Sequence, residues 1–158
     1  MQRTVLESLP AYASFATGVD RWAYNEAAFR HFLAIERRRA EASRQSVLLV
    51  LIRPRQDADA SADLPDDAAA AIFRGLGESV REVDFVGWFR EGRIAGAVLA
   101  HGNVPGSEKA RQLMAERVIH TLRTRLPRSQ TKQLRVRVVR LVSQTATERP
   151  QQPAARAL

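Results

Sequence analysis

The chain has 158 residues, which is enough for one globular domain and too short for two ordinary ones. Hydrophobic residues make up 45% and charged residues 27%, the balance of a folded globular protein. It contains no Cys, so a disulfide framework, a thiolate zinc site, an iron–sulfur cluster and a cysteine nucleophile are excluded. The net charge is +8, and ten Lys or Arg lie between Lys109 and Arg140 beside one acid, Glu116. This distribution predicts either a solvated Arg-rich face or affinity for nucleic acid, a nucleotide or an acidic partner.

The sequence of neither end of the chain predicts a targeting or membrane-spanning segment, and the tail over 143–158 has little that a core could bury. Residues 1–20 lack the continuous apolar stretch of a signal peptide, and no apolar run approaches the ~20 residues of a membrane-spanning helix. We therefore expect a cytoplasmic protein without membrane insertion. Its parts are an N-terminal extension over 1–20, a folded domain over 21–142 and a disordered tail over 143–158.

The first half of the domain predicts helix, strand, helix. Residues 24–44 place apolar side chains at helical spacing, with Asn25 as a candidate cap. Residues 46–52, which are apolar from Val47 on, predict a strand buried on both faces. A polar, acidic loop follows, and Asp66 or Asp67 can cap a second helix. The apolar positions of that helix are Ile72, Phe73, Leu76, Val80 and Val83.

The second half predicts two strands, a helix and a last strand. Residues 84–89 and 94–100 form a pair joined by a connection whose Gly92 suits a tight hairpin. A third helix is expected after Ser107, the candidate cap. Its apolar positions are Ala110, Leu113, Met114, Val118 and Leu122. The last strand, 133–142, alternates apolar and basic residues, so one face is apolar and the other basic.

The order of these elements is a helix followed by βαββαβ. This order is typical of a ferredoxin-like α/β (α+β) fold. We expect a four-stranded, mainly antiparallel sheet with an extra N-terminal helix and with the helices packed on one face.

Common catalytic motifs are missing from the sequence. His31, His101 and His120 lie far apart and none has a partner at metal-ligand spacing, so no metal site is predicted on them. Gly75 and Gly77 lack the third glycine of a dinucleotide fingerprint and lie within a helical pattern.

The most informative pattern begins at Arg81. Arg81 and Asp84 form an R-x-x-D pair. Five residues separate it from the hairpin 90–94, Arg-Glu-Gly-Arg-Ile, which leads into an apolar strand. Residues 25–29, Asn-Glu-Ala-Ala-Phe, resemble an N-R-x-x-F helix opening. Together these features resemble the diguanylate cyclase (GGDEF) domain family of the nucleotidyl cyclase palm superfamily, over roughly residues 20–142.

The departures from that family bear on activity. At the hairpin, Arg90 and Glu91 stand where the family has two glycines that admit GTP, and Gly92 stands at the metal-binding acid. The family's other metal-binding Asp falls within residues 51–54, Leu-Ile-Arg-Pro. Because phosphoryl transfer relies on divalent metal ions, we expect a degenerate domain that is not an enzyme and holds no metal or cofactor.

Arg81 and Asp84 match, by resemblance, the inhibitory site at which the family binds cyclic di-GMP. An Arg can take a phosphate or guanine edge bidentately, and an Asp can accept from guanine N–H groups. The same pair at a helix-to-strand junction can instead be a local salt bridge. Asn25 likewise matches the family's guanine-reading residue or is simply a helix cap.

A second candidate site is the hairpin itself. Its residues are a candidate partner surface, although aromatic residues in such a place more often belong to the core: Trp88, Phe89, Arg90, Glu91, Gly92 and Arg93.

The predicted function is a catalytically inactive regulatory or protein-interaction module. The resemblance connects it with bacterial cyclic di-GMP signalling or exopolysaccharide control. One alternative is a cyclic di-GMP receptor that uses Arg81 and Asp84. Another is an RNA-binding ferredoxin-like module, which is disfavoured because the aromatic segment of RRM-type domains is missing. A homodimer through helix faces or an edge strand stays open.

Overall fold

The computed structural model of the chain describes residues 23–55, 62–99 and 107–142. The expectations for the extension 1–20, for the loops around Asp57 and His101, and for the tail 143–158 lie outside the described residues.

The described residues confirm the expected order of elements and add two short ones, β1 and α4. The elements are β1 (Ala23–Tyr24), α1 (Glu26–Ser43), β2 (Ser46–Pro54), α2 (Asp66–Ser79), β3 (Phe85–Arg90), β4 (Ile94–Leu99), α3 (Glu108–Arg125), α4 (Arg128–Lys132) and β5 (Leu134–Val142). None of the helices in these ranges is both long enough and apolar enough to cross a bilayer.

The strands form one mixed sheet in the order β1-β3-β4-β2-β5. All neighbouring pairs are antiparallel except β1–β3, which is parallel. The expectation of four strands is wrong, because β1 adds a short fifth strand beside β3. Gly87 permits this approach, since a Cβ at that position would lie 2.5 Å from the carbonyl oxygen of Tyr24.

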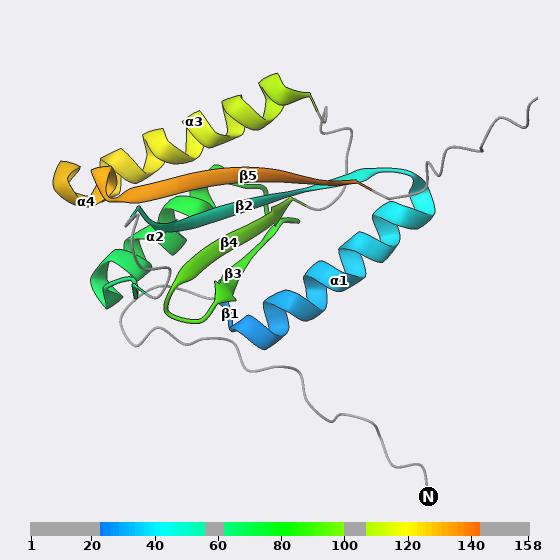
Figure 1. Cartoon of the computed structure of the whole chain (residues 1–158), viewed down its shortest axis with the longest axis horizontal. Coiled ribbons are helices and arrows are strands. Elements are labelled where there is room, and N and C mark those ends of the chain that lie inside the picture. Colours follow the sequence, from blue (N-terminus) through cyan, green and yellow to red (C-terminus); the bar gives the residue numbers. More distant parts are fainter. Residues whose placement is uncertain (1–22, 56–61, 100–106, 143–158) are drawn as a thin grey trace, which may run out of the picture.

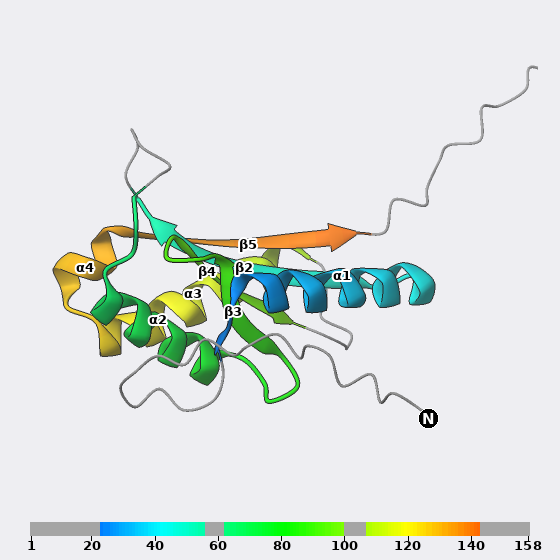
Figure 2. The ribbon, with the colours of Figure 1, turned by 90° about the horizontal axis from the view of Figure 1, so that it is seen from below.

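The helices cover both faces of the sheet. Leu48, Val50 and Ile52 of β2 belong to the core beneath α2 and α3, whereas Val47 and Leu49 pack with α1 on the opposite face. Figure 1 shows α3 and α1 on opposite sides of the sheet, and Figure 2 shows α2, α3 and α4 gathered on one side of β5. The expectation that all helices share one face is therefore wrong for α1. A strand that is apolar on both faces needs cover on both.

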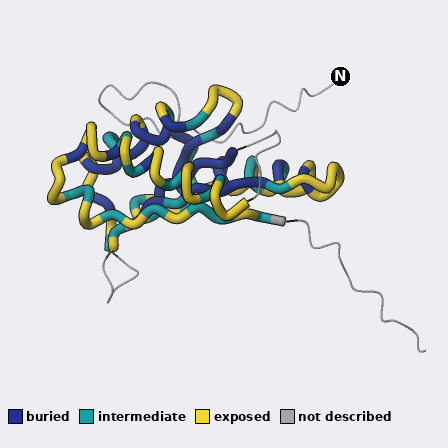
Figure 3. Tube along the Cα trace, turned by 90° about the horizontal axis from the view of Figure 1, so that it is seen from above, coloured by how far each residue is buried: buried dark blue, intermediate teal, exposed yellow. Residues whose placement is uncertain are grey.

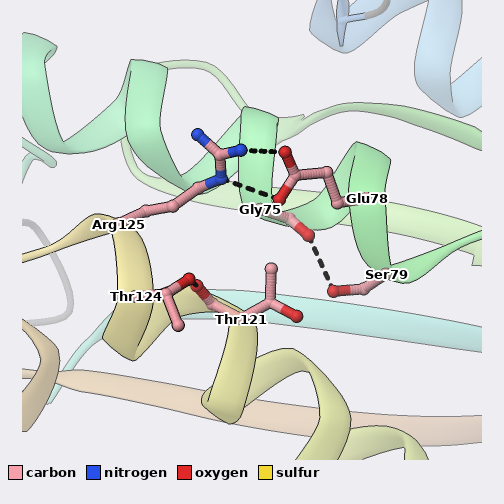
Figure 4. A network of polar contacts seen from close by, with 6 residues as sticks. All are labelled: Gly75, Glu78, Ser79, Thr121, Thr124 and Arg125. Carbon is pink, nitrogen blue, oxygen red and sulfur yellow. Dashed lines mark hydrogen bonds and ion pairs between the residues drawn. The ribbon is translucent and has the colours of Figure 1, made fainter.

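Helices α2 and α3 are held together by close packing and one ion pair (Figure 4). A Cβ on Gly75 would lie 3.0 Å from Cδ2 of Leu122, so the glycine lets the two helices approach. Arg125 forms an ion pair with Glu78, its Nε donating at 2.8 Å. The Ser79 hydroxyl, which is buried, donates to the Gly75 carbonyl oxygen at 2.7 Å.

Two of the three expected helix caps are confirmed. The Asn25 side chain accepts from a first-turn amide of α1 at 2.8 Å, and the Ser107 hydroxyl accepts from one of α3 at 3.2 Å. The expected cap of α2 is wrong: Pro65 occupies the cap position and makes no side-chain bond there. Asp66 and Asp67 instead lie in the first turn, where a negative charge favours the positive end of the helix dipole.

Two apolar residues expected in the core lie at the surface. Helix α2 ends at Ser79, so Val83 falls in the following turn and is 66% exposed, and Leu113 on α3 is 55% exposed. The tube in Figure 3 is dark blue through the central strands, while the edge strand β5 alternates between half-buried and exposed residues. That alternation confirms the apolar and basic faces expected for the last strand.

Candidate functional site at the hairpin

The turn between β3 and β4 is tight and anchored at both sides. Gly92 has a φ of +68°, a conformation that glycine adopts without steric cost, and the Arg93 amide donates to the Arg90 carbonyl at 3.0 Å. The Gly92 carbonyl accepts from the amide of Leu64 at 2.7 Å. The hairpin tip is thus tied to the segment that precedes α2.

The hairpin also contacts the beginning of α1 through two glutamates. The Glu91 amide donates to Oε2 of Glu26 at 2.8 Å, and the Glu26 amide donates to Oε2 of Glu91 at 3.3 Å. Arg30 forms an ion pair with Glu26 at 2.8 Å and lies 5.8 Å from the ring centre of Phe89. We call the reciprocal pair Glu26–Glu91 the glutamate clasp. It closes the gap between the N-terminus of α1 and the hairpin tip.

The end of β2 lies beside the base of the hairpin. Ile52 is the register partner of Ala95 on β4, so the exposed Arg53 follows directly at this end of the sheet. Arg93 pairs with Asp63 at 3.1 Å. In the part of the chain that the structure describes, no group of three His, Cys, Asp or Glu side chains is placed to hold a metal ion.

The two aromatic residues of the hairpin point to opposite faces of the sheet. Trp88 is 4% exposed and packs edge-on against Phe73, with ring centres 4.9 Å apart. Its burial agrees with the core reading of the hairpin aromatics and leaves Trp88 out of the partner surface. Phe89 is half-buried against Phe29, with ring centres 6.4 Å apart. The candidate partner surface is reduced to the residues 90–93.

Arg81 and Asp84 lie at the other end of β3, where they form a local turn. The Arg81 amide donates to Oδ2 of Asp84 at 2.8 Å, and the Asp84 amide donates to the Arg81 carbonyl at 3.0 Å. The Arg81 Nε lies 3.5 Å from the same carboxylate oxygen. The Asp84 side chain is 1% exposed and that of Arg81 is 56% exposed. The pair makes the contact that its spacing suggested, and the binding of cyclic di-GMP stays a prediction.

Sequence reasoning missed Glu26 as part of the site. It read Asn25 as a cap or guanine reader, and the structure confirms the cap. The bond from Glu91 to Glu26 joins residues 65 positions apart, so no local pattern announces it. An acidic residue directly after a helix cap, in a chain with one glutamate at the hairpin tip, was the available signal.

The fold and the hairpin place the chain in the class of palm-like α+β domains with an added N-terminal helix. No model of a known protein family matches the chain, and no curated protein matches it. Among solved structures, it is similar to the diguanylate cyclase SiaD from Pseudomonas aeruginosa, solved in complex with its activator SiaC. The TM-score is 0.55 at 22% sequence identity, covering 75% of this chain and 47% of that one. This likeness confirms the expected ferredoxin-like palm fold, and the match spans about half the length of that cyclase.

Proposed function

We propose that this chain is a GGDEF-like domain that has lost catalysis and acts as a regulatory protein-interaction module. The observation that carries the proposal is the glutamate clasp between α1 and the hairpin tip. By resemblance, GTP would enter between these same two elements. The fold shared with a diguanylate cyclase supports the assignment.

The chemistry of the hairpin opposes phosphoryl transfer. Arg90 and Glu91 carry side chains where the resemblance places the two glycines, and Gly92 offers no carboxylate to a metal. One carboxylate oxygen of Glu91 already accepts the Glu26 amide. Arg53 adds a positive charge at the end of β2, which disfavours a divalent cation there. Phosphoryl transfer needs such a cation to neutralise the charge that develops on the phosphate oxygens.

Incubation with GTP and Mg²⁺ or Mn²⁺ tests the loss of catalysis. We expect no cyclic di-GMP by chromatography, either from the wild type or from a Glu26→Ala variant that opens the clasp. Turnover by the wild type that Glu91→Ala abolishes would overturn the proposal, because it would make Glu91 a metal ligand.

A protein partner is the second part of the proposal. The similar cyclase is itself in complex with an activator protein. The corresponding role here is in cyclic di-GMP signalling or exopolysaccharide control, with the exposed Arg90 and Glu91 as contact residues.

Affinity capture from an extract of the source organism tests the partner surface. A partner retained by the wild type should be lost with Arg90→Glu. It should be kept with Arg38→Glu, a matched change on the exposed side of α1. Equal recovery with both variants would show that the partner does not bind at the hairpin. The exposed Leu113 on α3 would then be the next position to change, to Glu.

A further inference from the structure

A cavity of about 460 Å³ is lined by residues of α3, α4 and β5 and by Arg55 after the end of β2. Figure 1 shows α4, the end of α3 and the start of β5 together at one end of the sheet. Ile119 of α3 and Val136 of β5 contribute to its apolar lining. Four basic side chains also line it: Arg55, Arg123, Arg128 and Lys132. A volume of this size falls within the roughly 300–1,000 Å³ of small-molecule sites.

The charge of this cavity is uncompensated by the described residues that line it. No Asp or Glu is among them, and none of the four cations forms an ion pair with another described residue. By contrast, two other arginines of α3 do form ion pairs: Arg111 pairs with Glu108, and Arg125 pairs with Glu78 of α2. Like charges that line one cavity repel one another, and the repulsion weakens as the salt concentration rises. A bound anion would remove that repulsion.

We propose that this cavity binds an organic polyphosphate of nucleotide size. Guanidinium groups bind phosphate oxygens bidentately, so Arg123 and Arg128 would hold the phosphates at the rim. The aliphatic lining provided by Ile119 and Val136 would cover the planar apolar part of the ligand. A single phosphate ion would leave most of the volume empty. Arg55 and Lys132 also line a neighbouring cavity of about 540 Å³, to which Asp63 contributes an acid. That cavity gives the part of a larger ligand that carries no phosphate room to extend.

Calorimetric titration of the full chain with ATP and with inorganic triphosphate tests the proposal. The pocket variant is Arg123→Gln/Arg128→Gln, and the control is Arg37→Gln/Arg38→Gln, which removes the same charge from the exposed side of α1. We expect ATP affinity to fall about tenfold or more in the pocket variant and less than about twofold in the control. Ile119→Ala should weaken ATP and leave inorganic triphosphate unchanged. Thermal unfolding of each variant verifies that it is folded.

Three results would overturn the proposal. The first is no binding of either ligand at about 50 mM salt, where electrostatic attraction is strong. The second is equal weakening in the pocket and control variants, which would reveal a diffuse charge effect. The third is RNA binding that ATP does not displace, which would assign the basic residues to nucleic acid. None of these results bears on the inactive hairpin, because cyclic di-GMP synthesis is measured separately.

Discussion

Replacing glycine by alanine should have opposite effects on stability at two positions, Gly96 and Gly77. A Cβ on Gly96 would lie 2.8 Å from Cζ of Phe29, a fully buried side chain of α1, whereas a Cβ on Gly77 in α2 meets nothing within 4 Å. We expect Gly96→Ala to lower the free energy of unfolding by about 1–3 kcal/mol through overpacking. Gly77→Ala should raise it by about 0.5–1 kcal/mol, because alanine favours the helix. Urea denaturation measures both, and an undiminished stability of Gly96→Ala would contradict the packing of α1 on the sheet.

Substituting the two residues of the R-x-x-D pair one at a time should have unequal effects on stability, which distinguishes a structural role from ligand binding. Asp84→Ala removes a buried acceptor from the Arg81 amide, so we expect a loss of about 1–3 kcal/mol in unfolding free energy. Arg81→Ala should cost less than about 1 kcal/mol, since its side chain is mostly exposed.

Arg81→Ala is therefore the variant with which to test the receptor alternative. If the domain binds cyclic di-GMP through this pair, calorimetry should show binding to the wild type and none to the folded variant. Binding that survives in Arg81→Ala would place the ligand elsewhere on the surface.

Local spacing predicted residue contacts only where the partners are close in sequence. The contact of Arg81 with Asp84 and the cap by Asn25 each span three residues, and both are confirmed. Trp88 shows the limit, because both faces of β3 are covered and alternation alone does not say which residues a partner can reach. Glu26 and Glu91 meet only through the tertiary fold.

Among the elements, the N-terminus of α1 has the most direct connection to the candidate site. Asn25→Ala should cost about 0.5–2 kcal/mol by removing the cap, as Ser107→Ala should at α3. Only the first change loosens the end of α1 that carries Glu26. We therefore expect faster amide hydrogen exchange at Glu91 in Asn25→Ala, measured by NMR, and unchanged exchange in Ser107→Ala. Equal protection of Glu91 in both variants would show that the clasp does not depend on the cap.

The two elements that sequence analysis missed are short. The face of the sheet that α1 covers, which it also predicted wrongly, is decided by tertiary packing. The strand β1 has two residues and the helix α4 has five, too few to show a period of either kind. The long elements carry clear periods, and their order was sufficient to predict the ferredoxin-like topology. The position of α1 depends on the second apolar face of β2. The sequence of residues 46–52 shows that both faces of this strand are apolar, but not which helix covers each face.

At the scale of the whole molecule, the strand order leaves one basic edge. Arg135 and Arg137 of β5 are exposed and pair in register with Arg53 and Leu51 of β2. Positive side chains along an edge strand oppose pairing with a second copy of that strand. A homodimer through this edge stays a prediction, and these arginines disfavour it.

The packing of α1 also decides how strongly RNA should bind the face of the sheet that carries Arg135 and Arg137. RRM-type sheets stack bases on exposed aromatic residues, but here Tyr24, Phe85 and Phe89 pack with α1 on that face. Arginines without a stacking platform leave only the electrostatic part of the interaction. We expect labelled single-stranded RNA to bind weakly at about 50 mM salt, with binding lost by about 200 mM in fluorescence anisotropy. Sequence-selective binding that persists at the higher salt would mean that α1 leaves the sheet, and it would restore the RNA-binding alternative.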